Sequence, residues 1–285
     1  MDISIIVPIY KGNKYISPIM EMTKKNINYL NAQGKTLDIE LILVNDYPET
    51  PIFLERIDAG FNVIVIENET NVGIHQSRVN GLKMANGQYV LFLDQDDEIF
   101  DNCLYSQYMK IFDYDMVIGN GYRGIKGKYR KIYRTRAKQM LSCHEKYYVK
   151  AANQIISPGQ CLIKKDSIPA EWYQYIIHKN GGDDIFLWFL MFEKNKKFTI
   201  NEDCVYRHVE TGINLSKNID AMFASSQNIV EVCTRSKAIN ENVILGYKRR
   251  ITFTKTMQTS SIIKKILTCI LNMDICVYKL YAFYR

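Results

Sequence analysis

Four short runs of apolar, largely β-branched residues alternate with helix-like stretches over the first hundred residues, and this alternation constrains the fold most. The predicted strands are Ile3–Ile9, Ile39–Val44, Val63–Glu67 and Tyr89–Leu93, and the predicted helices are Pro18–Leu30 and Ile74–Ala85. Strands that are apolar on both faces and separated by helices indicate a mostly parallel sheet covered on both sides. The sequence therefore predicts a doubly wound α/β domain.

The pattern is weaker beyond residue 100. The segments with a clear preference are strands at Met116–Gly119 and Gln160–Ile163, a basic loop from Arg123 to Lys138 and a strongly apolar helix at Ile185–Phe192. From about Asp220 onward the sequence is typical of helices. We expect an α/β domain over residues 1–215, with halves at 1–100 and 101–215, and a helical region over residues 216–285.

The positive charge of the chain is concentrated at one end. Its 37 lysines and arginines exceed its 30 aspartates and glutamates by seven, and residues 246–285 hold eight basic side chains against Asp274 alone. The first 245 residues therefore carry 29 charges of each sign. A surplus confined to one end disfavours a nucleic-acid-binding protein and indicates a partner for the tail.

No segment has the length of a membrane span or the composition of a leader. The longest apolar run, Ile185–Phe192, has eight residues, whereas a bilayer requires about 20. The first ten residues carry an acid where a signal peptide carries positive charge. Seven cysteines without a C-x-x-C spacing indicate reduced thiols rather than disulfides or zinc ligands. We expect a cytoplasmic protein, peripheral on the inner face of the plasma membrane if the tail binds lipid.

Four acids crowd into five residues directly after the fourth predicted strand: Asp94, Asp96, Asp97 and Glu98. Carboxylates this close repel one another unless a cation or hydrogen bonds compensate them, and hard oxygen ligands suit Mg²⁺ or Mn²⁺. The alternative is an N-cap, in which Asp96 or Asp97 caps a helix beginning at Glu98. We favour a metal site, because ligands bind at the carboxyl ends of strands in such sheets.

The same edge of the predicted sheet carries two other candidate segments. Asp46 ends the second strand and could accept hydrogen bonds from a base or ribose, although Asn-Asp-x-Pro is also typical of a turn. Asn71 and Gly73 precede the second helix, whose Arg78 could bind a phosphate with its planar guanidinium group. An exposed helical arginine is the ordinary alternative. The chain lacks the glycine-rich fingerprints of a P-loop or a dinucleotide site.

Two acids and a histidine in the second half are further candidates. Asp183 and Asp184 at a helix start are typical caps, but a second carboxylate pair is also what a reaction with a general base requires. His208 could bind a metal or a phosphate, or be an ordinary surface or core residue. Both pairs of alternatives stay open on the sequence alone.

Taken together, these segments resemble the family 2 glycosyltransferases of the GT-A fold, inverting bacterial sugar transferases of capsule and O-antigen assembly. The similar segments are Ser4–Tyr10 for the opening strand, Asn71–Gly73 with Arg78, Asn80 and Gly81 for the middle motif, Gly87–Asp97 for the D-x-D segment, Ser157–Gln160 for the acceptor side and Asp183–Trp188 for the E-D motif. The resemblance covers about residues 1–215. It implies a GT-A-type doubly wound, mostly parallel sheet with a C-terminal helical appendage.

The resemblance also implies roles for the candidate residues. Those implied in donor binding are Pro8, Tyr10 and Asp46 at the nucleobase, Arg78 near the diphosphate, Asp94 at the ribose or the metal, and also Asn71 and Gly73. Asp96 would hold a Mn²⁺ or Mg²⁺ ion bridging the two phosphates, with Asp94 and His208 as further ligands. Asp184, beside Asp183, would take the proton from the acceptor hydroxyl.

Three positions depart from the family pattern. Asn45 stands where the family usually has an acid, the E-D pair is Asp183-Asp184, and Leu190 replaces the arginine that usually follows the tryptophan. The first departure bears on the nucleotide preference and the other two bear on the acceptor side.

The basic tail has an amphipathic pattern. Projected as a helix, Gln258–Tyr284 separates a lysine-bearing arc from an apolar arc, with Asp274 interrupting the apolar side and Ile275 the polar one. A helix packed on the domain is one interpretation. The other is an interfacial helix on anionic lipid, which the basic residues and the aromatic end favour.

The leading hypothesis is an inverting, metal-dependent hexosyltransferase. It would move a sugar from a nucleotide-diphosphate donor, with a UDP-sugar favoured, to a hydroxyl of a lipid-linked saccharide in surface polysaccharide synthesis. A sugar-phosphate nucleotidyltransferase is an alternative, but it would normally show a glycine-rich basic loop after the first strand. A non-catalytic membrane-associated scaffold of a polysaccharide assembly complex is another, and the retention of both acid clusters argues against it.

Overall fold

The computed structural model describes residues 1–54, 60–125, 127–178, 181–209 and 219–285. The chain divides into two compact units. The first comprises Met1–Ile132, Ile156–Ile168 and Lys196–Gly212, and the second comprises Tyr133–Ile155, Pro169–Asn195 and Ile213–Arg285. The predicted boundary between residues 215 and 216 lies outside the described residues.

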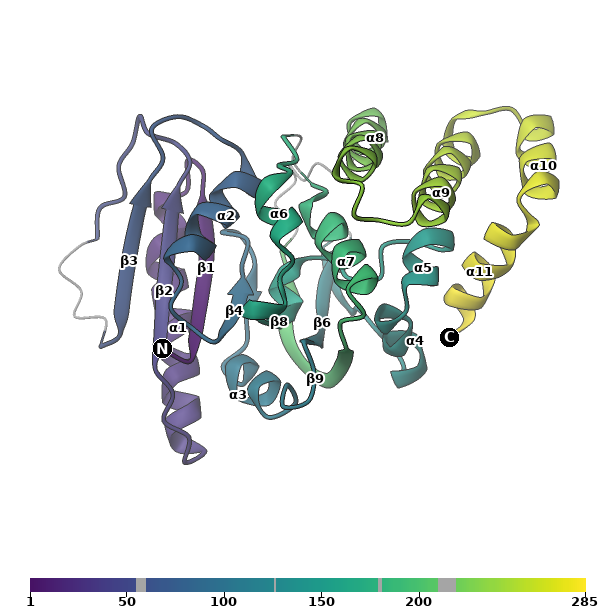
Figure 1. The fold of residues 1–285 in the computed structure, drawn as a ribbon. Coiled ribbons are helices and arrows are strands. Elements are labelled where there is room, and N and C mark those ends of the chain that lie inside the picture. Colours follow the sequence, from purple (N-terminus) through teal and green to yellow (C-terminus); the bar gives the residue numbers. More distant parts are fainter. Residues whose placement is uncertain (55–59, 126, 179–180, 210–218) are drawn as a thin grey trace. The chain divides into compact units, whose positions relative to one another are not determined.

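The first unit holds every strand of the described chain. In chain order its elements are β1 (Ile3–Ile9), α1 (Asn13–Ala32), β2 (Ile39–Asn45), β3 (Asn62–Glu67), α2 (Ile74–Met84), β4 (Tyr89–Phe92), β5 (Glu98–Ile99), α3 (Cys103–Tyr108), β6 (Met116–Ile125), β7 (Lys128–Lys131), β8 (Cys161–Lys164) and β9 (Phe198–His208). The strand order is β3-β2-β1-β4-β8-β6-β9-β5, with β7 paired to β6. Figure 1 shows β3, β2, β1 and β4 side by side in this order.

Strands β3, β2, β1 and β4 are parallel, as the sequence predicts. β8 runs antiparallel to both β4 and β6, whereas β6 and β9 are parallel. Alternate residues of β1 face opposite sides of this sheet. Ile5 and Val7 join a core cluster with residues of α1 and α3, while Ile6 lies against Gly81 of α2. Helices therefore cover both faces, and the predicted α/β fold class is confirmed.

Three features of this unit differ from the sequence-based expectations. The predicted basic loop is largely a hairpin, because β6 extends to Ile125 and pairs antiparallel with β7. No helix begins at Glu98; it starts β5, which pairs with β9, so the N-cap interpretation of the acid cluster is wrong. The long strand β9 was not predicted. It is interrupted by irregular pairing near Asn120, and its sequence lacks a clean alternation.

The second unit is helical over its described residues. Its helices are α4 (Arg136–Met140), α5 (Glu145–Lys150), α6 (Ala170–Gln174), α7 (Asp183–Glu193), α8 (Ile219–Ser236), α9 (Glu241–Thr259), α10 (Ile262–Leu271) and α11 (Met273–Tyr284). The predicted apolar helix corresponds to α7, whose residues 186–191 are all buried. Trp172 of α6 donates from Nε1 to the backbone oxygen of Asp183 over 3.0 Å, which fixes the start of α7.

The tail is not the single predicted helix. It breaks at Asn272, where α10 and α11 meet at 94°. Asp274 explains part of the break, since its carboxylate pairs with Arg249 at 3.0 Å and with Lys150 at 3.5 Å. No single helix of the described chain is long and apolar enough to cross a bilayer, and α10 and α11 meet the length and composition criteria only as a bent pair.

The two tail helices differ in what they contact. α11 packs within the second unit: Ile275 and Ala282 are buried, and the ring of Tyr281 stacks on that of Tyr147 with centroids 6.0 Å apart. α10 has no buried residue. Its exposed apolar side chains are Ile262, Ile263, Ile266, Leu267, Ile270 and Leu271. The packing interpretation therefore describes α11, whereas the apolar side of α10 faces outward.

Candidate active site

The candidate site lies where the parallel strands of the first unit end. Strands β1, β2 and β4 run in the same direction, so the loops after Ile9, Asn45 and Phe92 emerge at one edge of the sheet. Gln95 ties two of these loops together. Its Oε1 accepts from the backbone nitrogen of Tyr10 at 2.9 Å, and its Nε2 donates to the backbone oxygen of Tyr10 at 3.1 Å. The loops that follow these three strands therefore share one edge of the sheet.

Two tyrosines form one end of the edge. Tyr10 is 44% exposed and meets Tyr47 edge-to-face, with ring centroids 5.4 Å apart, and Lys11 Nζ lies 4.7 Å from the Tyr47 centroid. Beside them is a cavity of about 380 Å³ lined by Lys11, Gly12, Asn13, Lys14, Asn45, Tyr47 and Thr50. A hydrogen bond with Glu49 raises the pKa of the Tyr47 hydroxyl. Flat rings next to a basic cavity suit a nucleobase and its phosphates.

Asp46 is a buried hydrogen-bond acceptor that organises the neighbouring loop. Its Oδ1 accepts from Asn68 Nδ2 at 3.0 Å and from the backbone nitrogen of Val72 at 2.8 Å, and its Oδ2 accepts from the backbone nitrogen of Gly73 at 2.9 Å. Gly73 has a φ of 84°, which favours glycine, and precedes α2. The Asp46 carboxylate therefore holds the turn that begins α2.

The other predicted residues of this region differ in exposure. Pro8 is buried within β1, and Asn71 is exposed, with its Oδ1 accepting from the backbone nitrogen of Gly73 at 3.1 Å. Asn45, the departure from the family pattern, is also engaged. Its Nδ2 donates to Thr50 O at 2.9 Å and to Glu67 Oε2 at 2.5 Å. Tyr10 is exposed and Tyr47 is half-buried, so both rings are accessible at this end.

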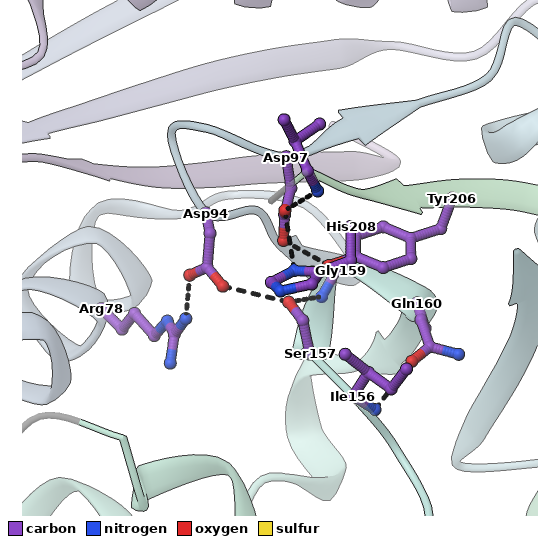
Figure 2. Close-up of polar contacts among 10 residues, drawn as sticks. Arg78, Asp94, Asp97, Ile156, Ser157, Gly159, Gln160, Tyr206 and His208 are labelled. Carbon is purple, nitrogen blue, oxygen red and sulfur yellow. Dashed lines mark hydrogen bonds and ion pairs between the residues drawn. The ribbon is translucent and has the colours of Figure 1, made fainter. Parts of the chain in front are cut away.

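Asp94 is held by residues from two distant segments. The guanidinium group of Arg78 on α2 forms an ion pair with its Oδ1, and Ser157 Oγ donates to its Oδ2 over 3.1 Å. Figure 2 shows Asp94 between these two partners. The Arg78 side chain is 4% exposed, so the interpretation of Arg78 as an exposed helical arginine is wrong. Arg78 and Ser157 fix the orientation of the Asp94 carboxylate.

Asp97 is the buried centre of a second network. Its carboxylate accepts from the hydroxyl of Tyr206 and from the backbone nitrogen of Val209 at 3.0 Å, and it lies 3.0 Å from Nδ1 of His208 (Figure 2). The hydrogen bond with Asp97 raises the pKa of His208. Burial, together with the charge of Asp97, raises the pKa of Tyr206 well above its usual range, so this phenol is a donor. The end of β9 thus places His208 beside the acid loop, Asp94–Glu98.

Asp96 has the electrostatic environment expected of a cation ligand. Partial burial, followed by the charges of Asp97 and Asp94, raises the pKa of its carboxyl group. Within the described chain no lysine or arginine pairs with it, whereas Asp94 has Arg78 and Asp97 has His208. A divalent cation would remove this repulsion.

The side chains of the acid loop suit a metal that is held partly by the protein and partly by substrate phosphates, rather than by protein ligands alone. Among the residues that the structure describes, no three His, Cys, Asp or Glu side chains converge on one point in the manner of a complete metal site. Mg²⁺, however, is commonly held by one or two carboxylates together with substrate phosphates. One ring nitrogen of His208 faces the carboxylate of Asp97, as is common for histidines that bind a metal through the other nitrogen. Asp96 is the aspartate of this loop that has no cationic partner among the described residues.

Asp183 and Asp184 lie in the second unit, at the N-terminal turn of α7. Asp183 is buried. The Oδ1 of Asp184 accepts from the backbone nitrogen of Ile185 at 2.8 Å, and Asn153 Nδ2 lies 3.4 Å from its Oδ2. The N-cap residue of α7 is Gly182 and no side chain caps the helix, so the capping interpretation of Asp183 and Asp184 is wrong. The hydrogen bond from Ile185 orients the Asp184 carboxylate within the first turn.

Sequence reasoning missed three residues of the site as partners. Ser157, Tyr206 and Gln95 each contact a predicted residue through a hydrogen bond between segments far apart in the chain. The only local signal was Tyr206-x-His208, since residues two apart on a strand point to the same face. That signal required β9 to be recognised as a strand first.

Comparisons with known proteins agree with this geometry. The Glycosyl transferase family 2 model matches residues 4–169. A glycosyltransferase of Streptococcus pneumoniae, GlyG, is 34% identical over 126 residues, covering 42% of this chain and 39% of GlyG. The poly(ribitol-phosphate) beta-glucosyltransferase of Bacillus spizizenii is 30% identical over 137 residues, covering 45% of this chain and 20% of the relative. The matched region is thus less than half the length of either relative.

A solved structure extends the similarity in fold. The crystal structure of Staphylococcus aureus TarS residues 1–349 in complex with UDP-GlcNAc aligns with a TM-score of 0.58 at 16% identity. The alignment covers 91% of this chain and 74% of that one. At this identity the comparison shows a shared fold.

Proposed function

The chain belongs to glycosyl transferase family 2, and on this basis we propose that it transfers a sugar from a nucleotide-diphosphate donor to a hydroxyl of a saccharide. One observation supports this proposal most: the acid loop, Asp94–Glu98, lies at the same sheet edge as the aromatic and basic cavity beside Tyr47. A nucleotide sugar requires both a flat surface for its base and compensation of its diphosphate charge.

UDP-sugars are the favoured donors in this proposal. TarS was crystallised with UDP-GlcNAc, and its fold aligns over most of this chain. Tyr10 and Tyr47 offer ring surfaces for the uracil, while Asn45 replaces a carboxylate that would otherwise accept from the base. Asp46 contributes indirectly, because its oxygens hold Val72 and Gly73. The proposed donor site therefore relies on rings and backbone groups more than on Asp46 itself.

The proposed cofactor is Mn²⁺ or Mg²⁺. Asp96 would hold it, with Asp94 and His208 as the further candidates, and when bound the cation neutralises charge on the departing nucleoside diphosphate. The chain's own residues prepare this site: Arg78 and Ser157 orient Asp94, and Asp97 orients the imidazole of His208.

Asp184 is the proposed general base. A carboxylate at the start of α7 can accept the proton of the attacking acceptor hydroxyl, and attack from the face opposite the leaving group inverts the anomeric carbon. Asp183 is buried and would support the turn. We expect Asp184→Asn to retain donor binding and lose transfer, because the amide oxygen can still accept from the backbone nitrogen of Ile185 but the amide is not a base. Full transfer by this variant contradicts the base assignment.

We further propose a lipid-linked acceptor in surface polysaccharide synthesis, with α10 in contact with the membrane surface of the cytoplasmic side. The exposed apolar residues of α10 flank Lys264 and Lys265, an arrangement that suits anionic lipid. Ile263→Asp with Ile266→Asp should abolish binding to anionic liposomes. The matched control is Leu245→Asp with Met222→Asp, two exposed positions of α9 and α8, which should bind normally. Equal binding by both pairs contradicts the proposal.

The direct test of the transferase assignment is release of a nucleoside diphosphate from a panel of nucleotide sugars with Mn²⁺ present. We expect one donor to be turned over and Asp96→Ala to lose this activity. A folded protein that releases nothing from the whole panel contradicts the proposed function.

A further inference from the structure

The β6–β7 hairpin carries an unusual concentration of positive charge. Residues 123–138 contain eight lysines and arginines and no acid. Four of them lie in the described part of the hairpin itself, and all four are exposed: Arg123, Lys128, Arg130 and Lys131. Within the described chain, none of these four forms an ion pair with an acidic side chain. The first 245 residues are neutral as a whole, so this patch is a local feature.

Strand register places two of these arginines in line with His208. Arg123 of β6 is opposite Arg130 of β7 and also opposite His208 of β9. Paired positions on neighbouring strands project to the same face of a sheet, about 4.8 Å apart. His208, Arg123 and Arg130 therefore form one row across three strands, which we call the cationic row. Lys128, two residues from Arg130, lies on the same face.

The cationic row begins at the acid loop. Nδ1 of His208 lies 3.0 Å from the carboxylate of Asp97 in that loop. The row thus leads outward from the residues assigned to the donor. A negatively charged acceptor would be repelled by the acid loop, and adjacent guanidinium groups offset that repulsion.

On the opposite face of the sheet, the corresponding arginine is neutralised by an acid. There Arg207, paired with Tyr122 in register, forms an ion pair with Glu98 at 2.6 Å and lies 5.0 Å from the ring centroid of Tyr129. That cation is neutralised within the protein. Arg123 and Arg130, by comparison, are like charges directly opposite one another, an arrangement that destabilises a sheet unless an anion is bound.

We propose that the cationic row binds an acceptor polymer with repeating negative charges and guides its hydroxyl toward the acid loop. This inference rests on the proposed transferase function, since it names the class of acceptor. Arginine is well suited to the role because its planar fork binds phosphate and carboxylate oxygens in pairs. The shared chemistry is a polyanion, either phosphodiester-linked or uronate-containing.

Binding to soluble probes tests the inference without requiring turnover. The probes are a poly(glycerol phosphate) oligomer, polygalacturonate and uncharged dextran, titrated into the full chain at low and high salt. We expect binding of at least one anionic probe, no binding of dextran, and weaker binding at high salt. The anionic probe that binds identifies the charged group. Binding of dextran as tight as that of both anionic probes overturns the inference.

Charge-neutral variants locate the site. Arg123→Gln with Arg130→Gln should weaken binding of the anionic probe by about tenfold or more, which corresponds to about 1.4 kcal/mol. Lys131→Gln is the matched control on the opposite face of β7, and Lys24→Gln with Lys35→Gln controls for the loss of two charges elsewhere. These controls should change the affinity by less than about twofold. Equal losses in the control and row variants overturn the inference.

Two further measurements separate the possible failures. The melting temperature of the Arg123→Gln, Arg130→Gln variant should not fall, because opposed charges have been removed; if it does not fold, Lys128→Gln supplies the row variant. The row variant is also tested for binding to anionic vesicles. If it loses vesicle binding but still binds the poly(glycerol phosphate) oligomer, a lipid surface is the partner and the polymer inference is wrong. Anionic-probe binding that depends on the row, without turnover of any nucleotide sugar, supports the row and contradicts only the proposed function.

Discussion

The ion pair between Arg78 and Asp94 yields the sharpest energetic prediction, because it joins α2 to the acid loop. Two opposite unit charges about 4 Å apart attract by about 4 kcal/mol at an effective dielectric constant of 20, whereas exposed pairs contribute about 0–1 kcal/mol. The Arg78 side chain is 4% exposed and that of Asp94 is 24% exposed. We therefore expect an intermediate coupling energy of about 2 kcal/mol in a double-mutant cycle of Arg78→Met and Asp94→Asn.

The readout should be local, because a chain with two compact units need not unfold in one transition. Hydrogen exchange of the β4 amides, whose strand leads directly into Asp94, reports the free energy of opening in this region. The exposed pair of Lys25 and Glu21 on α1, at 3.8 Å, is the matched control and should couple by less than about 0.5 kcal/mol. A coupling below about 0.5 kcal/mol for Arg78 and Asp94 would refute the claim that Arg78 positions this carboxylate.

Three further predictions concern stability. Asp46→Asn should destabilise the first unit by about 2 kcal/mol, because an amide nitrogen would oppose one of three donors that now bind the carboxylate; unfolding in urea measures this, and an unchanged midpoint contradicts it. Burial and the charge of Glu193 raise the pKa of Glu145 from 4.5 to about 7, so stability should fall as pH rises through this interval. Glu145→Gln should therefore stabilise the protein by about 1 kcal/mol at pH 8, after allowance for solvent screening, and by little at pH 4, as thermal unfolding at the two pH values will show. Gly121→Ala should cost several kcal/mol, since its Cβ would lie 2.1 Å from the backbone oxygen of Tyr206; a melting temperature equal to that of the parent protein contradicts this.

The first four strands could be predicted from sequence because their signal is local. β1 and β2 are buried at every position, and continuous apolar runs of that length between helices have few other interpretations. β9 could not be predicted in the same way. Its Asn201–Asp203 segment is polar and coincides with shifted pairing to β6, so neither alternation nor a continuous apolar run marks it.

The candidate site likewise combines features that are local in the sequence with contacts between distant segments. The clustering of Asp94, Asp96 and Asp97 is visible in the sequence, but their different roles depend on partners far along the chain. Arg78 and Ser157 bind Asp94, while Tyr206 binds Asp97 across 109 residues. Sequence spacing carries no record of such contacts, which explains why the N-cap alternative could be excluded only once β5 was seen to pair with β9.

The tail shows how tertiary contacts override an amphipathic pattern. The periodicity of residues 258–284 predicted one helix, yet Asn272 separates α10 from α11, and Asp274 in the first turn of α11 pairs with Arg249. Asp274 interrupts the apolar arc of the predicted helix, and the chain in fact changes direction just before it, between α10 and α11. The membrane proposal accordingly concerns α10, which has no buried residue, rather than α11, whose Ile275 and Ala282 are buried.

The central claim is that the acid loop at the sheet edge compensates the charge of a nucleotide-sugar donor. Binding of UDP measured by calorimetry, with and without Mn²⁺, tests it most directly in the parent protein and in Asp96→Ala. We expect Mn²⁺ to strengthen UDP binding to the parent protein about tenfold or more and to have little effect on the variant. Equal enhancement by Mn²⁺ in both proteins, or no UDP binding by the folded parent chain, would contradict it.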